Sequence, residues 1–324
     1  MTVEIPSEQT AIIQNEEAIL RITPGLPIPK LRDDQILVKT QAVALNPCDF
    51  KMPARFPTPG LWNGCDFAGT VVAIGDEAAS QKPAKFRIGA LVFGAVQGSN
   101  RDDPQSGAYC QYLAADAAYT FKAPDDMLPT TAVAMCGTAL ATVGMALFQS
   151  LRLSGTLSNP VSGKRQETVL VWGGSSSVGL MTIQILKMNA LRYVVDPFAD
   201  IKTMAQCYEA IGRAGGSYCA LEKYQETVAA TRQAVKPHLV MGSAITGRGL
   251  SLPKPYGAPS DAELHSWSLG YYEELQRAMD EERLKPCPIQ MIPGGFGGIL
   301  HGLDMLKNKK VSGKKLIVSL DEVN

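Results

Sequence analysis

The stretch "VLVWGGSSSVGLMTIQILKMNALRYVVD", residues 169–196, carries the strongest fold signal in the sequence. Its first residues are apolar and typical of a buried strand, and the small residues from Gly173 to Gly179 form a tight turn. The apolar residues that follow predict a helix. A strand that passes through such a turn into a helix presents backbone N–H groups where a pyrophosphate can bind. The stretch therefore predicts the first unit of an α/β nucleotide-binding fold.

This turn is a degenerate form of the dinucleotide pattern G-x-G-x-x-G. Counted from Gly174, the middle glycine is replaced by Ser176, so an ordinary strand-to-helix turn stays open as an alternative. Small residues still allow a phosphate to approach, and three serine hydroxyls can donate hydrogen bonds to it. A hydrolase nucleophile elbow, G-x-S-x-G, is disfavoured because no serine of the turn has glycine two residues before and two residues after it.

The spacing between the turn and the next strand suggests a particular cofactor. An acidic residue about 20 residues after the turn binds the adenosine ribose in this class of site. Asp196 closes the next apolar run, "LRYVVD", at that spacing. Taken alone, the spacing predicts an NAD site with Asp196 on the ribose 2′-hydroxyl.

Composition limits the possible partners. The chain has 324 residues, of which 45% are hydrophobic, and this is enough for two domains with full cores. Lys plus Arg and Asp plus Glu both number 31, and no run of five like charges occurs. We therefore expect neither nucleic acid nor a membrane surface as a partner.

The cysteines and the apolar segments favour a reduced, cytoplasmic protein. The 7 cysteines include no C-x-x-C pair, which is typical of buried thiols, and residues 1–10 carry no secretory-signal pattern. Residues 127–151 contain no charge and are long enough to cross a bilayer. Their threonines, proline and small residues favour a buried helix of a soluble protein instead.

The chain divides into two parts by pattern. Up to about residue 121, short apolar runs alternate with Gly and Pro turns, which predicts a barrel-like antiparallel β domain. After the polar loop at residues 153–167, strands and helices alternate, which predicts a parallel sheet covered by helices. The elements expected after the quoted turn are helices at 178–188 and 201–211 and strands at 191–195, 217–221 and 238–245, and a final strand is expected in "KVSGKKLIVSL".

Several motifs together resemble one known family. They are "NPCDFK" (46–51), "GCDFAGTVVAIG" (64–75), "VLVWGGSSSVG" (169–179), "AIGRAGGSYCALE" (210–222), "PYG" (255–257) and "GGFGGILHGLDMLKNKKVSGKKLIVSL" (294–320). In this combination and order, the chain resembles the trans-acting enoyl reductases of fungal polyketide synthases. These belong to the zinc-independent, quinone-oxidoreductase-like side of the medium-chain dehydrogenase/reductase superfamily.

The resemblance implies a fold class and a domain plan. The fold expected is α/β, with a GroES-like β-barrel domain and a Rossmann-like, doubly wound parallel sheet. The GroES-like catalytic domain would comprise residues 1–135, completed by 287–324, and the Rossmann-like cofactor domain would comprise 136–286.

The resemblance also changes the interpretation of "LRYVVD". This segment is similar to the fourth Rossmann strand of the family, so two βα units, on the order of 40 residues, would be missing near Ala190. Relatives bind the 2′-phosphate of NADPH at the end of the second strand with a polar or basic cluster, and residues 188–200 offer none. If the deletion is genuine, we expect NADPH affinity to suffer. The alternative is that the natural protein contains these two βα units and that only the recorded sequence omits them.

We expect no metal in the site. Zinc-dependent relatives place a cysteine ligand near position 46 and Gly-His-Glu near position 64, where this chain has Asn46 and "GCDF". The three histidines, His238, His265 and His301, are expected on the surface or hydrogen-bonded in the core.

Two residues are the candidates for catalysis. Reduction of an α,β-unsaturated thioester requires a group that stabilises enolate charge and a proton source. The resemblance places Lys51 and Thr138 beside the nicotinamide of NADPH, where an ammonium can stabilise charge or donate a proton and a hydroxyl can orient substrate or ribose. A surface lysine and a threonine bonded to its own helix turn stay open as alternatives.

The resemblance implies further contacts to cofactor and substrate. Small residues in the expected acyl-chain lining suit a long apolar chain, but tight helix packing requires the same pattern. The residues expected to line the cofactor are Cys48, Lys51, Ser175, Ser176, Ser177, Val178, Met241, Gly242, Val311 and Ser312, and those expected to line the acyl chain are Ala139, Leu140, Ala141, Thr142, Val143 and Gly144.

Two function classes remain open. The first is a monomeric, NADPH-dependent enoyl reductase that works on a chain carried by the acyl carrier domain of a polyketide synthase, in secondary metabolite biosynthesis. The second is a catalytically silent or repurposed relative that keeps the cleft as a binding or non-redox site.

Overall fold

The computed structural model describes residues 5–17, 19–81, 85–153, 156–157, 169–187, 193–211 and 215–321. The chain forms two compact units, here called the β unit (residues 1–138 and 286–324) and the α/β unit (residues 139–285). The sequence predicts that two βα units are missing near Ala190. This position lies outside the described residues.

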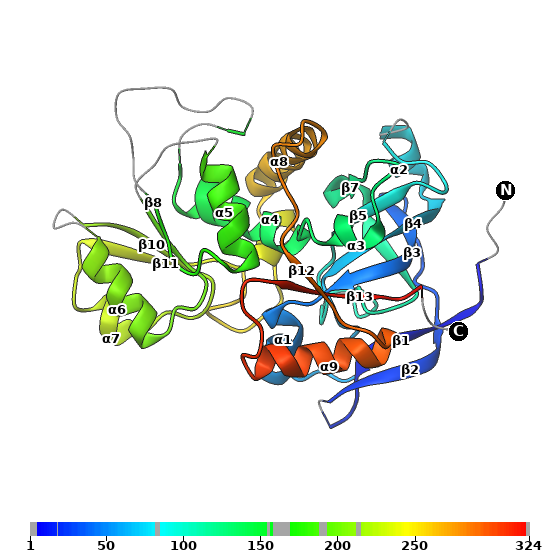
Figure 1. Ribbon diagram of the computed structural model, residues 1–324, viewed down its shortest axis with the longest axis horizontal. Helices are drawn as coiled ribbons and strands as arrows, with labels where there is room; N and C mark the ends of the chain where they lie inside the picture. The colour runs from blue at the N-terminus through cyan, green and yellow to red at the C-terminus, as the bar shows by residue number, and fades with distance from the viewer. Residues whose placement is uncertain are drawn as a thin grey trace. The chain divides into compact units, whose positions relative to one another are not determined.

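The β unit is built on a seven-stranded sheet and a separate two-stranded ribbon (Figure 1). The sheet has the strand order β12-β13-β3-β4-β5-β7, with β6 paired to β3, and β1 and β2 form the ribbon. The bounds are β1 (Glu8–Gln14), β2 (Leu20–Pro27), β3 (Gln35–Ala44), α1 (Pro47–Arg55), β4 (Asp66–Ile74), α2 (Asp76–Gln81), β5 (Leu91–Ala95), β6 (Tyr112–Asp116), η1 (Ala117–Tyr119), β7 (Thr120–Lys122), α3 (Pro129–Val133), β12 (Ile289–Met291), α9 (Gly295–Lys307) and β13 (Lys315–Ser319).

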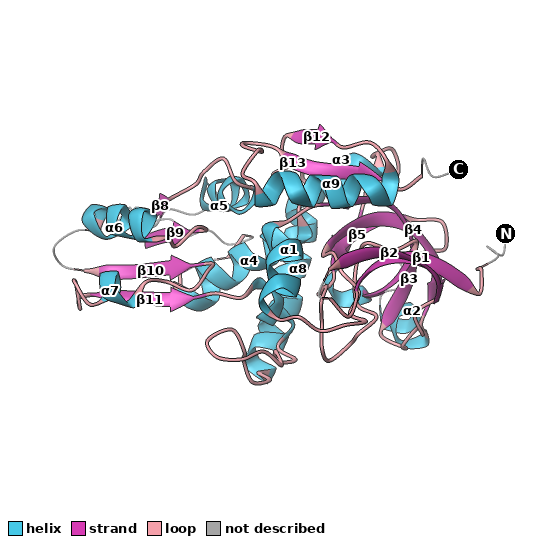
Figure 2. Cartoon of the chain, turned by 90° about the horizontal axis from the view of Figure 1, so that it is seen from below, coloured by secondary structure: helices cyan, strands magenta, loops and turns pink. Residues whose placement is uncertain are grey.

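The two ends of the chain meet in this sheet. Strand β13 pairs antiparallel with β3, so the C-terminal segment completes the domain begun by the N-terminal one. Helix α9 contacts α1, β2 and β13 (Figure 2). Most pairings are antiparallel as expected, but β12 pairs parallel with β13.

The core of the β unit follows from strand alternation. Residues that point inward from β3, β4 and β13, such as Val43, Phe67 and Val318, are fully buried and belong to one apolar cluster with Phe296 and Ile299 of α9. Burial of such side chains is worth about 1.5–3 kcal/mol each, so this cluster fixes the register of the three strands.

The α/β unit contains a four-stranded parallel sheet in the order β11-β10-β9-β8. Helices α6 and α7 lie next to each other and contact β9 and β11, respectively (Figure 1). The elements are α4 (Gly137–Gly144), which begins at the end of the β unit, η2 (Met145–Ser150), β8 (Val169–Val171), α5 (Ser177–Lys187), β9 (Tyr193–Asp196), α6 (Ile201–Ala210), β10 (Gly216–Ala220), α7 (Glu226–Ala229), β11 (Val235–Leu239), η3 (Gly242–Thr246) and α8 (Ala262–Asp280).

These elements confirm the predicted fold class of a β domain joined to an α/β domain with a parallel sheet. The predicted strand at 238–245 is wrong in its position. Strand β11 ends at Leu239, and residues 242–246 form a 3₁₀ helix that ends at Gly247 in the left-handed conformation, with φ of 67°. An apolar run by itself did not distinguish these two conformations.

The uncharged segment at 127–151 is not one continuous helix. Helix α3 ends at Val133, Cys136 has a φ of 58°, and α4 then starts at Gly137 and continues into the π-helical turn η2. Among the described residues, residues 129–150 form one apolar stretch long enough to cross a membrane, and 78% of its most apolar part is buried. This burial is typical of a core segment of a soluble protein.

Candidate functional site

A buried polar cluster in the β unit forms because of strand register. Ala44 of β3 pairs with Ile317 of β13 on one side and with Asp66 of β4 on the other. Lys315 lies two residues before Ile317, and Asn46 lies two residues after Ala44, so both occupy the sheet face that carries Asp66. We call Asn46, Asp66, Thr138 and Lys315 the Asp66 cluster.

Asp66 is fully buried and accepts four hydrogen bonds. Its Oδ1 accepts from the backbone N–H of Thr138 at 2.7 Å and from the Thr138 hydroxyl at 2.6 Å. Its Oδ2 accepts from the Asn46 amide at 3.0 Å and from the Lys315 ammonium at 2.9 Å. Lys315 also donates to the Asn46 side-chain oxygen. A buried carboxylate satisfied in this way holds all of its donors in fixed positions.

The charge of Asp66 is balanced by Lys315, which is only 3% exposed. Burial by itself would lower the pKa of Lys315, but the Asp66 carboxylate more than offsets this effect, and the pKa is raised. Lys315 is therefore a permanent cation inside the β unit.

Thr138 is positioned by a close backbone approach. Helix α4 begins against β5, where a Cβ added to Gly137 would lie 2.6 Å from the carbonyl carbon of Gly94. Only glycine permits this contact. The turn at Cys136 directs the Thr138 N–H and hydroxyl to Asp66, so both donate to a carboxylate on β4.

Helix α1 carries Cys48, Asp49 and Lys51 at the end of β3. Lys51 is half-buried. Asp49 is buried, and its Oδ2 accepts from the Tyr109 hydroxyl at 2.6 Å and from the Asn46 N–H at 2.7 Å. Burial raises the pKa of Asp49 to about 6, although these two hydrogen bonds act in the opposite direction.

The glycine and serine turn of the α/β unit has an internal hydrogen-bond pattern. The Ser176 hydroxyl donates to the Gly173 carbonyl at 2.8 Å and accepts from the Gly179 N–H at 3.1 Å. Gly173 has a φ of 67°, and a Cβ on Gly179 would lie 2.3 Å from the Gly173 oxygen. Ser176 therefore braces the turn, whereas Ser175 is exposed and the N-terminus of α5 begins at Ser177.

Residues predicted to line the cofactor lie in both units. In the α/β unit, Met241 and Gly242 stand at the start of η3, and a Cβ on Gly242 would lie 2.2 Å from the Thr142 hydroxyl oxygen. In the β unit, Val311 and Ser312 precede β13 in a loop, with Val311 half-buried and Ser312 exposed. Only glycine fits at position 242, which brings η3 against α4.

The six residues predicted to line the acyl chain, residues 139–144, are all buried in α4. The Tyr271 hydroxyl donates to the Leu140 carbonyl at 3.0 Å, and a Cβ on Gly144 would lie 2.3 Å from the Tyr271 ring. Tight packing against α8 thus accounts for part of the small-residue pattern, which was the alternative that the sequence left open.

No local sequence pattern pointed to Lys315 as part of a site. It was part of a predicted terminal strand, and its contact with Asn46 joins residues 269 positions apart. The signal that could have identified it is its place at the start of a strand whose next three residues are buried and apolar, since a lysine that is buried needs a partner. Asp66, which belongs to the motif "GCDFAGTVVAIG" at 64–75, is the centre of the cluster.

Asp196 does not present its carboxylate for a ribose. It is fully buried and accepts from the Tyr218 hydroxyl at 2.8 Å, the Phe198 N–H at 2.9 Å and, more weakly, the Cys207 thiol at 3.9 Å. The NAD site predicted from spacing alone is therefore not supported by the environment of this residue.

Comparison with known proteins identifies the family. Residues 32–125 match the alcohol dehydrogenase GroES-like domain. The chain is 43% identical over 344 residues to the trans-enoyl reductase phmE of Phaeosphaeria nodorum, covering 100% of this chain and 98% of that protein. It is 41% identical over 359 residues to the trans-enoyl reductase RAP1 of Pyricularia oryzae, covering 98% of this chain and 99% of that protein.

Solved structures share the fold at low sequence identity. The enoyl reductase CurK superposes with a TM-score of 0.68 at 15% identity, covering 96% of this chain and 99% of that one. The mycobacterial protein Rv1454c, solved in complex with NADPH, superposes with a TM-score of 0.64 at 17% identity, covering 96% and 99%. Identity above 40% over nearly the full length, together with this fold, makes the chain an oxidoreductase of the medium-chain dehydrogenase/reductase superfamily that belongs to the trans-acting enoyl reductases of fungal polyketide synthases.

Proposed function

We propose that this chain is a trans-acting, NADPH-dependent enoyl reductase. Its substrate is an α,β-unsaturated thioester carried by the acyl carrier domain of a polyketide synthase, in secondary metabolite biosynthesis. The observation that carries the proposal is the near-full-length identity to proteins named trans-enoyl reductases. NADPH is proposed because a structural neighbour was solved with it and because the family resemblance implies it.

The residues of the α/β unit fit a dinucleotide phosphate in part. The turn at 173–179 is built of small residues, its Ser175 is exposed, and α5 is long enough, at 11 residues, to present a helix N-terminus. Ser176 is used inside the turn, so we assign anion binding to Ser175, Ser177 and the N–H groups of the first turn of α5. Val178, Met241 and Gly242, with Cys48, Val311 and Ser312 of the β unit, stay proposed cofactor contacts.

When bound, NADPH supplies the hydride for the β-carbon of the enoyl group. The chain must then stabilise the negative charge that develops on the thioester oxygen and deliver a proton. We assign this role to Lys51, whose ammonium can donate a hydrogen bond to the enolate and then a proton. Substrate contact is assigned to residues 139–144 on α4.

The geometry restricts the role of Thr138. Its hydroxyl donates its proton to Asp66 Oδ1 at 2.6 Å, so toward a ligand this hydroxyl can act only as an acceptor. Thr138 is therefore proposed to orient a donor, such as a ribose hydroxyl or a carboxamide, rather than to protonate the substrate.

Substitution of the two candidates tests the assignment. In an assay of NADPH consumption with a crotonyl thioester, Lys51→Ala should lower kcat by about 10²- to 10⁴-fold if Lys51 is the proton donor. Thr138→Ala should also lower turnover. Lys39→Ala, which removes an exposed lysine of β3, is the control and should retain activity. Unchanged rates in both Lys51→Ala and Thr138→Ala would refute the assignment.

A second candidate function is a catalytically silent relative that keeps the site for binding. The observation in its favour is that β8, the strand before the turn, is the edge strand of the described parallel sheet. In the common doubly wound order, 3-2-1-4-5-6, the strand before the turn is central. The alignments with RAP1 and phmE span 359 and 344 residues, both more than the 324 of this chain, so these relatives contain residues that this chain lacks. We propose that these residues include βα units deleted near Ala190.

A deletion of the second strand would remove the part of the fold that recognises the adenosine end of NADPH. We therefore expect weak NADPH binding by the 324-residue chain, together with turnover that requires high NADPH concentration. Fluorescence titration measures the affinity. Tight NADPH binding would contradict the expected loss of affinity. Absence of thioester-dependent NADPH oxidation at saturating NADPH would favour the catalytically silent relative.

The oligomeric state, the compartment and the roles of the two units are also proposals. We propose a monomer in the cytoplasm, with the β unit as the catalytic domain and the α/β unit as the cofactor domain. Light scattering of the purified chain measures its molar mass and so tests whether it is a monomer.

A further inference from the structure

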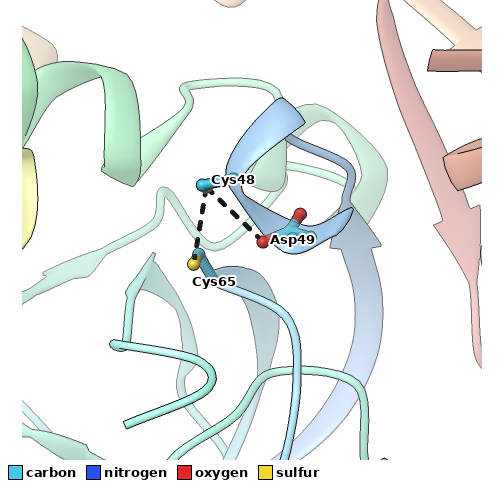
Figure 3. Close-up of side chains that lie close together, drawn as sticks. All are labelled: Cys48, Asp49 and Cys65. Atoms are coloured by element: carbon cyan, nitrogen blue, oxygen red, sulfur yellow. Dashed lines mark hydrogen bonds between the residues drawn. The ribbon is translucent and has the colours of Figure 1, made fainter. Parts of the chain in front are cut away.

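Two thiols and a carboxylate converge at the first turn of α1. Figure 3 shows Cys48 and Asp49 on this turn and Cys65 on the segment that enters β4. The Cys48 and Cys65 sulfurs are 3.9 Å apart, and both residues are half-buried. The Cys48 sulfur is 3.7 Å from Asp49 Oδ1. Two cysteines whose sulfurs face each other at this range can be bridged.

From this geometry we propose that Cys48 and Cys65 are an oxidisable thiol pair, which hydrogen peroxide converts to a reversible disulfide that lowers enoyl reduction. The effect on enoyl reduction rests on the proposed function, whereas formation of the disulfide does not. A small peroxide can reach half-buried thiols, and a thiol reductant can reverse the bond.

The surroundings give Cys48 a proton acceptor. Asp49 Oδ2 accepts from the Tyr109 hydroxyl at 2.6 Å and from the Asn46 N–H at 2.7 Å, which leaves Oδ1 to face the Cys48 sulfur. The hydrogen bond from Cys65 lowers the pKa of Cys48, although burial and the Asp49 charge raise it by more. The hydrogen bond with Cys48 and burial raise the pKa of Cys65 well above its ordinary value. Cys48 is therefore the thiol that ionises first, and Cys65 is the thiol that closes the bond.

The reaction consumes one hydrogen peroxide per disulfide. Cys48 passes its thiol proton to Asp49 Oδ1, its thiolate attacks one peroxide oxygen, and the O–O bond breaks. The leaving hydroxide takes the proton back from Asp49 and departs as water. The Cys65 sulfur then attacks the Cys48 sulfenic acid, the S–S bond forms and a second water leaves. The two thiols lose two electrons together, and the peroxide gains them.

A second thiol pair in the β unit provides the comparison. The Cys136 and Cys287 thiols also contact each other, but these residues are only 0% and 3% exposed. Burial raises the pKa of Cys136 well above its ordinary value. Because oxidation of a thiol depends on its exposure and on its ionisation, we expect Cys136 and Cys287 to stay reduced while Cys48 and Cys65 oxidise.

The disulfide would act on the helix that carries the proposed proton donor. Lys51 lies three residues after Cys48 on α1, so the two side chains are neighbours on one face of this helix. The bond draws the first turn of α1 toward the start of β4 and removes the free thiol of Cys48, a proposed cofactor contact. A displacement of about 1 Å at a catalytic group can cost about 100-fold in rate, so we expect turnover to fall about 10- to 100-fold.

Treatment of the purified 324-residue chain with hydrogen peroxide tests the pair. We expect the loss of two of its 7 free thiols, an intact mass lower by that of two hydrogen atoms, and one new cross-linked peptide that contains Cys48 and Cys65. Thioester-dependent NADPH oxidation should fall as this disulfide forms and should return after treatment with dithiothreitol.

Two cysteine substitutions separate the thiol pair from other oxidation. Cys65→Ser should keep its turnover when reduced, but its oxidised Cys48 has no second thiol and proceeds beyond the sulfenic acid, so dithiothreitol should not restore turnover after peroxide. Cys287→Ser is the matched control and should form the Cys48–Cys65 disulfide as the wild type does. If Cys65→Ser does not fold, the peptide map of the wild type and its reversal by dithiothreitol decide the question.

Two results would overturn the proposal: absence of the Cys48–Cys65 peptide after peroxide, or unchanged turnover of the fully disulfide-bonded chain. A reduced chain without turnover would instead refute the proposed function, and the peptide map would still decide whether the disulfide forms.

Discussion

Asp66 and Asp196 are both fully buried, but they are satisfied in different ways. Asp66 lies at the start of β4 and faces the Lys315 ammonium, so its charge is balanced by a full positive charge. Asp196 lies at the end of β9 and has three neutral donors: the Tyr218 hydroxyl, the Phe198 N–H and the Cys207 thiol. The difference shows that burial alone does not identify a functional carboxylate, and that the partners decide how costly each one is to disturb.

The largest effect is expected when the charge pair of the Asp66 cluster is broken. Lys315→Met leaves a buried carboxylate without its cation, so the free energy of unfolding should fall by about 3–5 kcal/mol. Urea unfolding followed by tryptophan fluorescence measures this. The double variant Lys315→Met/Asp66→Asn should lose less than the single variant, because both charges are gone.

The exposed pair Arg87–Asp125 is the control for this experiment. Both side chains are about 70% exposed, so Asp125→Asn should cost no more than about 1 kcal/mol. A loss below that size for Lys315→Met would show that the buried pair is not the main support of the cluster.

A smaller effect is expected at Asp196. Asp196→Asn keeps the shape of the side chain but replaces one carboxylate oxygen with an amide N–H₂. At least one of the three donors to Asp196 therefore loses its acceptor. The expected loss is about 1–3 kcal/mol in the same assay. A loss equal to that of Lys315→Met would remove the distinction between the two aspartates.

Thr138→Val removes one of the two donors to Asp66 Oδ1 and retains the backbone donor. We expect a loss of about 1 kcal/mol in the free energy of unfolding. Because the proposed role of Thr138 is to accept a hydrogen bond, Thr138→Ser should restore both stability and turnover. If Thr138→Ser did not restore turnover, the hydroxyl group at position 138 would not be the group that turnover requires.

The smallest effect is a lack of pH dependence. The raised pKa of Lys315 means that its contribution is fully present below its ordinary pKa of 10.5 and is lost only as the pH rises through the higher folded value. The stability difference between the wild type and Lys315→Met should therefore stay constant between about pH 8 and pH 10. A difference that grows across this interval would show that the pKa of Lys315 is lowered in the folded protein rather than raised.

Local pattern predicted the elements better than their contacts. The turn at 173–179, helix α5 and strands β9, β10 and β13 are all found close to their predicted positions, because apolar periodicity and small-residue turns are local signals. The 3₁₀ helix after β11 was missed because its apolar residues continue those of the strand.

The Asp66 cluster could not be derived from local pattern. It depends on the register between β13 and β3, which joins opposite ends of the chain. The spacing of Asp196 from the turn suggested a ribose contact, although Tyr218, two strands from β8, determines its environment. Lys51 and Thr138 came from the family resemblance, and their roles are still proposals.

The most direct test of the central claim is NADPH oxidation by the 324-residue chain with a crotonyl thioester at high NADPH concentration. We expect oxidation of one NADPH per thioester reduced, with the rate strongly lowered in Lys51→Ala and unchanged in Lys39→Ala. A folded chain that binds NADPH but shows no thioester-dependent oxidation would contradict it.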